Sequence, residues 1–219
     1  MLRTAVFLAA LLPAAAAQAV TLSDAQLAGY EANVAGEFGY AIALGDLGLS
    51  TISSVKITDS SVATETGGNT TGFDFDGLVI GTNASDPSTL TAASSYVFQA
   101  GGVGSNTTLV GSNNNATINE SFATPGVLDG TTSGGFAGFV SMGNNGMITA
   151  LFDTPVAVTD GLFIFIREIG TNERLSSVEI TGAPVPPPAA VPLPAGAALL
   201  LGGLGALGVA RMRRTRVGG

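Results

Sequence analysis

The sequence has no cysteine, no histidine and no tryptophan, and it holds only eight basic residues among its 219. The absence of cysteine excludes disulfide bonds and thiolate metal sites. The absence of histidine removes the side chain that most often acts as a general acid or base near neutral pH, and also the commonest transition-metal ligand. Catalytic sites of the Ser-His-Asp or Cys-His kind are therefore excluded.

Charge is distributed unevenly along the chain. All sixteen acidic residues lie between Asp24 and Glu179, where only three basic residues accompany them, so this part carries a net charge of −13. Such a stretch repels polyanions, and we expect no nucleic-acid partner. Its acidity indicates a solvated surface, with attraction of Ca²⁺ as the alternative interpretation.

The first nineteen residues have the pattern of a secretory signal peptide. Arg3 supplies an early positive charge, residues 4–17 are almost wholly apolar, and small residues stand at Ala17 and Ala19. This pattern predicts export and cleavage by signal peptidase between Ala19 and Val20. Residues 1–19 are accordingly set apart from the folded domain.

Residues 20–182 predict an all-β domain. Short hydrophobic segments alternate with turns rich in Gly, Asn, Ser and Asp, which is typical of an antiparallel β-sandwich, here expected to be jelly-roll-like. The expected strands are Tyr40–Leu44, Ser53–Asp59, Gly72–Gly81, Ser94–Ala100, Phe136–Met142, Met147–Asp153, Leu162–Glu168 and Arg174–Thr181.

Four local features of this domain are also predicted. Ser23 or Asp24 can cap a short helical turn. The Asn-Gly pair within residues 143–146 predicts a hairpin between the two segments beside it. Residues 162–168 are the most hydrophobic strand and are expected to be central, and the spacing of Leu175 and Val178 indicates a β-bulge.

The chain ends in three successive segments. Residues 183–190 form a proline-rich spacer, expected to be extended. Residues 195–210 are uncharged and apolar, and predict a short transmembrane helix that flanks the domain on its C-terminal side. A basic cluster then predicts a cytoplasmic end, and it consists of Arg211, Arg213, Arg214 and Arg216.

The tail at residues 191–216 resembles the PEP-CTERM class of sorting signals in its VPLPA variant. The motif is Val191, Pro192, Leu193, Pro194 and Ala195, followed by the apolar span and the arginine cluster. The resemblance implies recognition by an exosortase, a membrane-embedded cysteine transpeptidase or protease. It also implies a Gram-negative envelope and an association with exopolysaccharide or biofilm. A plain membrane anchor is the alternative. Residues 141–180 additionally resemble, more loosely, a segment common in exported bacterial surface proteins.

Asp74 and Asp76 are the best local pair for chemistry. Residues i and i+2 of a strand share a face, so the two carboxylates could bind one Ca²⁺ ion; the alternative is a solvated strand face. No catalytic residue and no other cofactor is expected. Paired carboxylates could also hydrolyse a glycosidic bond, but no feature of the sequence marks which pair.

These observations favour an exported, non-enzymatic cell-surface or extracellular-matrix protein. It would be held in the membrane by its C-terminus until an exosortase acts on it, and then reach the cell surface or medium. One alternative is a carbohydrate-binding module, assisted by Ca²⁺ and acting on exopolysaccharide. A second alternative is a secreted hydrolase that uses carboxylates.

Overall fold

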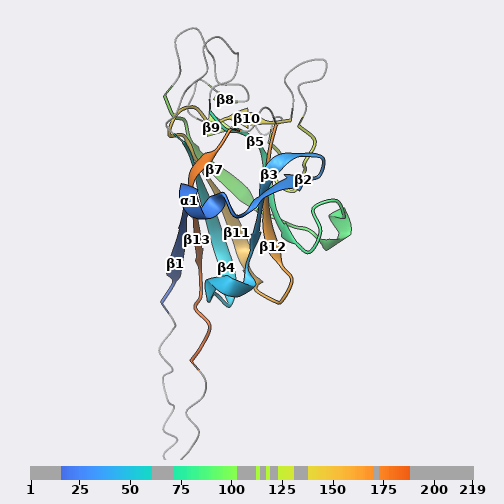
Figure 1. Cartoon of the computed structure of the whole chain (residues 1–219), viewed down its shortest axis with the longest axis vertical. Coiled ribbons are helices and arrows are strands. Elements are labelled where there is room, and N and C mark those ends of the chain that lie inside the picture. The colour runs from blue at the N-terminus through green and yellow to red at the C-terminus, as the bar shows by residue number, and fades with distance from the viewer. Residues whose placement is uncertain are drawn as a thin grey trace, which may run out of the picture. The chain divides into compact units, whose positions relative to one another are not determined.

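The computed structural model describes residues 16–60, 72–102, 112–113, 117–118, 123–130, 138–169 and 173–187. The sorting motif, the apolar span and the arginine cluster lie outside these residues, as does the signal peptide before residue 16. The described chain is mostly antiparallel β-structure in two sheets (Figure 1). The expected all-β sandwich is confirmed at that level. In the part that is described, no helix has the length and apolar character needed to cross a bilayer.

The first sheet, sheet A, has five antiparallel strands. Their order is β1 (Gln18–Ser23), β13 (Leu175–Gly182), β4 (Thr51–Asp59), β11 (Met147–Ala157) and β7 (Ser95–Gln99). β4 alternates strictly near its end, with Val55, Ile57 and Asp59 buried and the residues between them half-buried. This period of two places one face of the strand against the second sheet.

The second sheet, sheet B, has β12 at its centre. The order is β10 (Val140–Ser141), β5 (Asp74–Gly81), β12 (Phe163–Glu168), β3 (Glu37–Ala43) and β2 (Glu31–Val34), and β6 (Thr91–Ala92) also pairs with β5. Smaller elements are β8 (Ser112–Asn113), β9 (Thr117–Ile118), the helical turn α1 (Asp24–Leu27) and the 3₁₀ turns η1 (Gly45–Leu47) and η2 (Pro87–Thr89).

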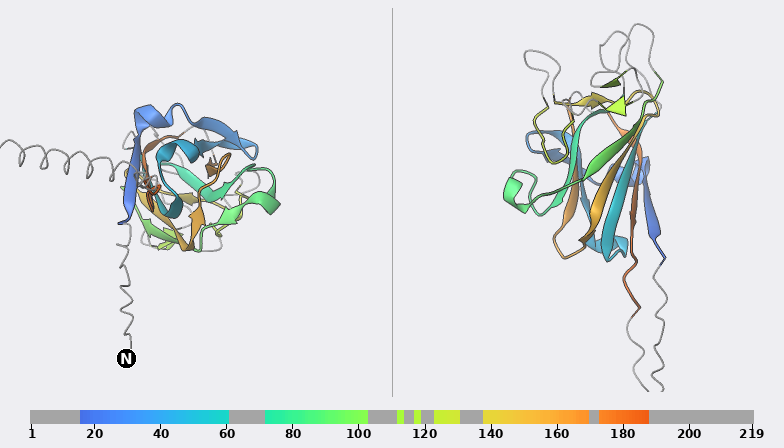
Figure 2. Two further views of the ribbon diagram at one scale, coloured as in Figure 1. Left: turned by 90° about the horizontal axis from the view of Figure 1, so that it is seen from below. Right: turned by 180° about the vertical axis from the view of Figure 1, so that it is seen from behind.

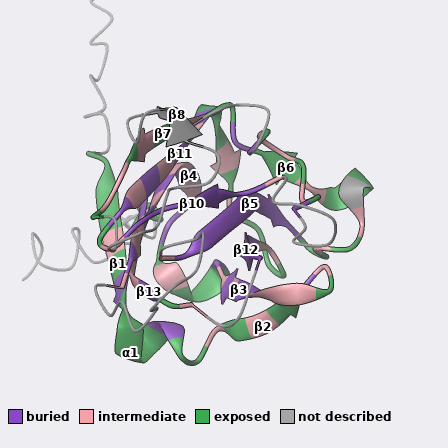
Figure 3. Ribbon diagram, turned by 90° about the horizontal axis from the view of Figure 1, so that it is seen from above, coloured by how far each residue is buried: buried purple, intermediate pink, exposed green. Residues whose placement is uncertain are grey.

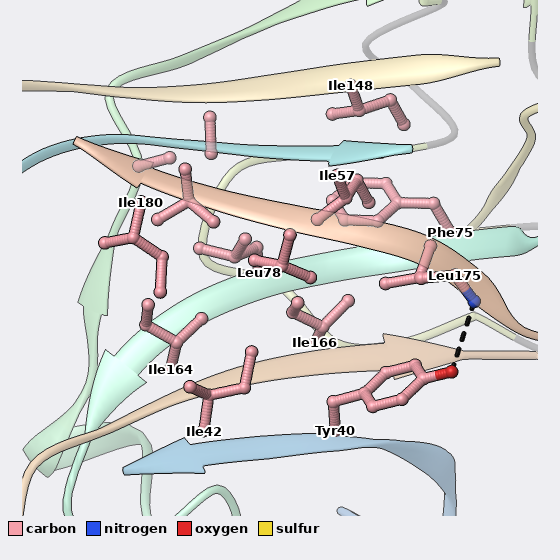
Figure 4. Close-up of a cluster of buried hydrophobic side chains, with 14 of the residues drawn as sticks. Tyr40, Ile42, Ile57, Phe75, Leu78, Ile148, Ile164, Ile166, Leu175 and Ile180 are labelled. Atoms are coloured by element: carbon pink, nitrogen blue, oxygen red, sulfur yellow. Dashed lines mark hydrogen bonds between the residues drawn. The ribbon is translucent and has the colours of Figure 1, made fainter. Parts of the chain in front are cut away.

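The main core lies between the inner faces of the two sheets (Figure 4). Ile164 and Ile166 of β12 point into it, whereas Phe165 belongs to a separate small cluster on the other face of sheet B. The Tyr40 hydroxyl lies inside the core and has a hydrogen-bond partner there. It accepts a hydrogen bond from the Leu175 backbone N–H at 3.2 Å. Burial raises the pKa of Tyr40 to about 12, so the phenol stays neutral at physiological pH.

Three of the local predictions are confirmed. α1 begins after Ser23, and Gln26 Oε1 accepts a hydrogen bond from the Ser23 N–H at 3.0 Å. β12 is the central strand of its sheet. The register of β13 against β4 shifts between Leu175 and Ser177, which is the expected bulge.

The predicted hairpin around residues 143–146 is wrong. The turn exists, with Asn145 at a φ of 62° and the Gly146 N–H donating to the Gly143 carbonyl. However, β10 pairs with β5 in sheet B, whereas β11 pairs with β4 and β7 in sheet A. The Asn-Gly turn therefore carries the chain from one sheet to the other, because turn chemistry fixes the local bend but not the partners of the strands beside it.

Strands β1 and β2 were not predicted. β1 begins at Gln18, two residues before the expected first residue of the domain, and Gln18 faces Gly182 across the sheet. The first residues of the expected spacer are also bound to the sandwich. The Ser50 N–H donates to the Ala183 carbonyl at 2.7 Å, and the Val185 N–H donates to the Gly48 carbonyl at 3.0 Å. The compact unit accordingly extends to Val185.

Candidate functional site

Both aspartates singled out from the sequence lie on β5, which is buried along its whole length (Figure 3). Asp74 is 3% exposed and Asp76 is fully enclosed. The interpretation of this stretch as a solvated strand face is therefore wrong. A carboxylate enclosed in this way needs partners, because burial without them costs several kcal/mol, about 2–7 for a polar group and more for a charge.

A β-bulge in β5 determines the position of Asp76. Arg167 of β12 faces Gly77 of β5, but the next residue, Glu168, faces Phe75, so Asp76 is the extra residue on its strand. Bulges of this kind re-aim a side chain and increase the local twist. Asp76 consequently has no opposite residue in the ladder, and its carboxylate meets the side chain of Arg167 on the neighbouring strand.

Asp76 is the centre of a buried ion pair. Its Oδ2 lies 2.7 Å from Nη1 of Arg167, and its Oδ1 accepts a hydrogen bond from the Gly130 N–H at 2.8 Å. The Arg167 side chain is only 9% exposed. Gly130 belongs to the segment 123–130, which covers β5: a Cβ added at Gly77 would meet Leu128 Cδ2 at 2.6 Å. The ion pair thus anchors this covering segment to sheet B.

Burial raises the pKa of Asp76 to about 6 from its ordinary value of 3.8. The Gly130 N–H and the Arg167 guanidinium act in the opposite direction, since both favour the charged carboxylate, but loss of hydration outweighs them. Because the carboxyl holds its proton more tightly in the folded state than in the unfolded state, this group makes folding less favourable as pH rises from about 4 to 6.

The neighbouring acidic side chains have different partners. Asp74 Oδ1 accepts a 2.6 Å hydrogen bond from Ser141 Oγ on β10, and Asp59 Oδ1 accepts one from the Phe73 N–H at 2.9 Å. These hydrogen bonds join Asp74 to β10 and Asp76 to β12, the two strands on either side of β5. Among the described residues, no group of three or more acidic side chains is placed to hold a metal ion. A calcium ion could bind Asp76 only after displacing Arg167, and the Ca²⁺ hypothesis stays a prediction.

A second feature lies on the outer face of sheet B, where two adjacent hollows of about 330 and 270 Å³ share Ala35, Ala84 and Ser85. We call the pair the sheet B groove. Its remaining described lining residues are Asn33, Ala41, Thr82, Asn83, Leu90, Gly126, Leu128, Phe163 and Phe165. The walls are the β2–β3 hairpin on one side and the loop after β5, which carries η2 and projects from the sandwich, on the other (Figure 2).

Comparison with known proteins gave no match: no family model, no curated protein and no solved structure matches this chain. The site must therefore be judged from its own residues.

The structure places the predicted signal-cleavage residues at the sandwich. Ala17 directly precedes β1, and Ala19 lies within β1, facing Thr181. The sequence predictions missed Arg167, Gly130 and the sheet B groove. A lone arginine inside the most hydrophobic strand, in a domain with only three basic residues, was the one available signal of a buried partner.

Proposed function

We propose that this chain is an exported, non-enzymatic surface or matrix protein whose C-terminal tail is sorted by an exosortase. The sequence of the tail is the main support. The geometry of the sandwich adds the observation that best fits display from a tether: β1 begins where β13 ends, at one end of the sandwich (Figures 1 and 2). The turn at residues 143–146 lies at the opposite end, since Met147 faces Thr58 near the end of β4.

We further infer that the sandwich is of jelly-roll type. The support is the strand order, with β1-β13-β4-β11 in sheet A and β3-β12-β5-β10 in sheet B. Along the chain the later strands β10, β11, β12 and β13 alternate between the sheets, and each inserts beside an earlier strand. Two interlocked Greek keys give this pattern. In such a fold the first and last strands are neighbours, which brings both points of attachment to one place.

In the described chain, the backbone contacts between the C-terminal segment and the sandwich end at Val185. The hydrogen bond from Val185 to Gly48 and the bridge between Leu49 and Pro184 are the most C-terminal backbone contacts of the described chain. Five residues separate Val185 from the motif at Val191. If extended as polyproline, these residues and the flanking bonds span about 19 Å, at roughly 3.1 Å per residue. We propose that this spacer keeps the motif accessible to a membrane enzyme while the sandwich stays folded.

We expect mass spectrometry of the native protein to show an N-terminus at Val20 and a C-terminus within or beside residues 191–195. Pro194→Ala alters the motif and is expected to leave the arginine-bearing tail on the protein. Pro187→Ala, a proline substitution in the spacer, is the matched control and should be processed like the original chain. An intact tail on the native protein in the inner membrane would contradict sorting and indicate a simple anchor.

A further inference from the structure

The sheet B groove has an aromatic floor. Phe163 and Phe165 stand at i and i+2 on β12, so both point away from the main core, and their rings stack with centroids 5.8 Å apart at 27°. Phe165 is 8% exposed and packs in the outer cluster with Val34 and Val79, whereas Phe163 is half-buried and partly open to solvent. A partly exposed ring held in place by a buried one presents a rigid apolar surface at little entropic cost.

One asparagine amide stands beside this floor in a fixed orientation. Asn83 Oδ1 accepts a hydrogen bond from the Ser85 N–H at 3.0 Å. This turn uses the oxygen of the amide and leaves its Nδ2 group as a donor that the turn does not need. The groove also holds the hydroxyl groups of Thr82 and Ser85, which can donate or accept.

The described lining of the groove is uncharged, although the protein is strongly acidic. The residues of this lining are all apolar or neutral polar. Asp86, the closest acid in sequence, is occupied inside its own loop, where its Oδ1 accepts hydrogen bonds from both the N–H and the hydroxyl of Ser88. A cationic ligand would find no carboxylate in this lining and an anionic one no basic group, so the charge pattern fits a neutral ligand.

We propose that the sheet B groove binds a neutral polysaccharide. The apolar C–H face of a sugar ring would stack on Phe163, and its hydroxyl groups would accept from Asn83 and exchange hydrogen bonds with Thr82 and Ser85. The two adjacent hollows, each near the lower limit of small-ligand sites, suit successive sugar units of one chain. This inference goes beyond surface display and does not depend on how the tail is processed.

The test is affinity electrophoresis of the exported protein in native gels. Separate gels contain dextran, galactomannan or soluble hydroxyethyl-cellulose as neutral probes, and alginate as the polyanionic probe. An acidic protein migrates readily under these conditions, and binding slows it. We expect retardation in at least one neutral polymer and none in alginate. Free migration in all three neutral gels, or retardation in alginate alone, would overturn the proposal.

Two variants and one control locate the binding site. Phe163→Ala removes the open ring, and we expect about tenfold weaker binding, as for the loss of one stacking contact. Asn83→Asp keeps the acceptor that its turn requires but removes the donor, and it should weaken binding by a similar factor. Asn145→Asp is the matched control, since it adds a charge at an exposed turn outside the groove where aspartate also tolerates the positive φ of 62°.

Thermal unfolding of each variant separates lost binding from lost folding. A folded Asn83→Asp variant that binds as well as the original protein would overturn the proposal, even if Phe163→Ala does not fold. If the Asn145→Asp control lost binding to the same extent as the groove variant, the proposal would also be overturned, because the effect would then be general charge repulsion. The protein termini, measured independently, report on sorting and not on this site.

Discussion

Replacing Arg167 with methionine is expected to lower the free energy of unfolding by about 3–5 kcal/mol at pH 7. The substitution leaves the Asp76 carboxylate enclosed without its counter-ion, and removal of one partner from a buried pair has a cost of this order. Asp76 still accepts from the Gly130 N–H, but that neutral donor cannot replace a guanidinium 2.7 Å away. Methionine retains much of the apolar bulk of arginine, so the lost charge dominates the result.

The loss of unfolding free energy caused by Arg167→Met should become smaller as the pH is lowered. Burial already raises the pKa of Asp76 to about 6 with Arg167 present, and without Arg167 the pKa must rise further. A raised folded-state pKa means that the protonated carboxyl is favoured by folding, so acidification through this range restores stability. Because the pKa of Asp76 in the original chain is about 6, linkage limits this recovery to at most about 1.4 kcal/mol between pH 7 and pH 5, so we expect the loss to shrink by about 1 kcal/mol without vanishing.

Asp76→Asn is also expected to lower the free energy of unfolding at pH 7, by an amount comparable to Arg167→Met. The amide keeps an acceptor oxygen for Gly130 or Arg167, but the Arg167 guanidinium, only 9% exposed and always charged, is left without its counter-ion. Urea unfolding followed by circular dichroism measures all three proteins across pH 5 to 7. Lys56→Met is the control for loss of a cation: its ion pair with Glu179 is 2.7 Å long but about one-third exposed, so its loss should cost less than about 1 kcal/mol. A cost of Asp76→Asn or of Arg167→Met no larger than that of Lys56→Met would contradict a buried ion pair at this site.

Gly39→Ala is expected to destabilise the protein by about 3 kcal/mol, or to prevent folding. Gly39 lies on β3 opposite Arg167 of β12, and a Cβ at this position would overlap the backbone carbonyl oxygen of Ile166. Neither strand can yield easily, because both belong to the middle of sheet B and the same Cβ would also crowd Val34. Overpacking at a site enclosed by backbone has costs of this size.

The matched control is Gly45→Ala in η1, where an added Cβ meets no atom within 4 Å. This change should be neutral or slightly stabilising, since alanine restricts the unfolded chain more than glycine does. The comparison uses the midpoint of thermal unfolding. An equal effect of the two substitutions would show that the close approach of β3 to β12 is not as tight as the structure has it. A folded Gly39→Ala protein should also bind more weakly at the sheet B groove, which β12 and β3 both line.

The local features of this fold were predictable because they depend on neighbours in the chain. Alternating apolar residues predicted β4, a continuous apolar run predicted β12, and the irregular spacing of Leu175 and Val178 predicted a bulge. The Asn-Gly pair predicted a turn with a positive φ at Asn145. Each of these signals lies within about ten residues of sequence, where the conformation of the backbone is largely set by steric limits and side-chain spacing.

The partners of the strands could not be predicted in the same way. A period of two shows which residues of β10 and β11 share a face, but it does not show that these strands belong to different sheets. Strand β1 could not be predicted for the same reason. Its residues Gln18 and Ala19 belong to the expected signal peptide, and they pair with residues more than 160 positions away. Pairing over such separations depends on the packing of the whole core, and a short window of sequence does not indicate which strands will pair.

The sequence by itself determined the β-class of the domain, its acidic character and the absence of any cysteine or histidine chemistry. It also supplies the signals on which the proposed export and sorting rest. Only the tertiary structure showed how Asp74 and Asp76 are placed. The bulge and the covering segment help to enclose them, and the two buried carboxylates accept hydrogen bonds from different residues. The sheet B groove likewise exists only in the fold, because its walls come from segments that only long-range pairing brings together.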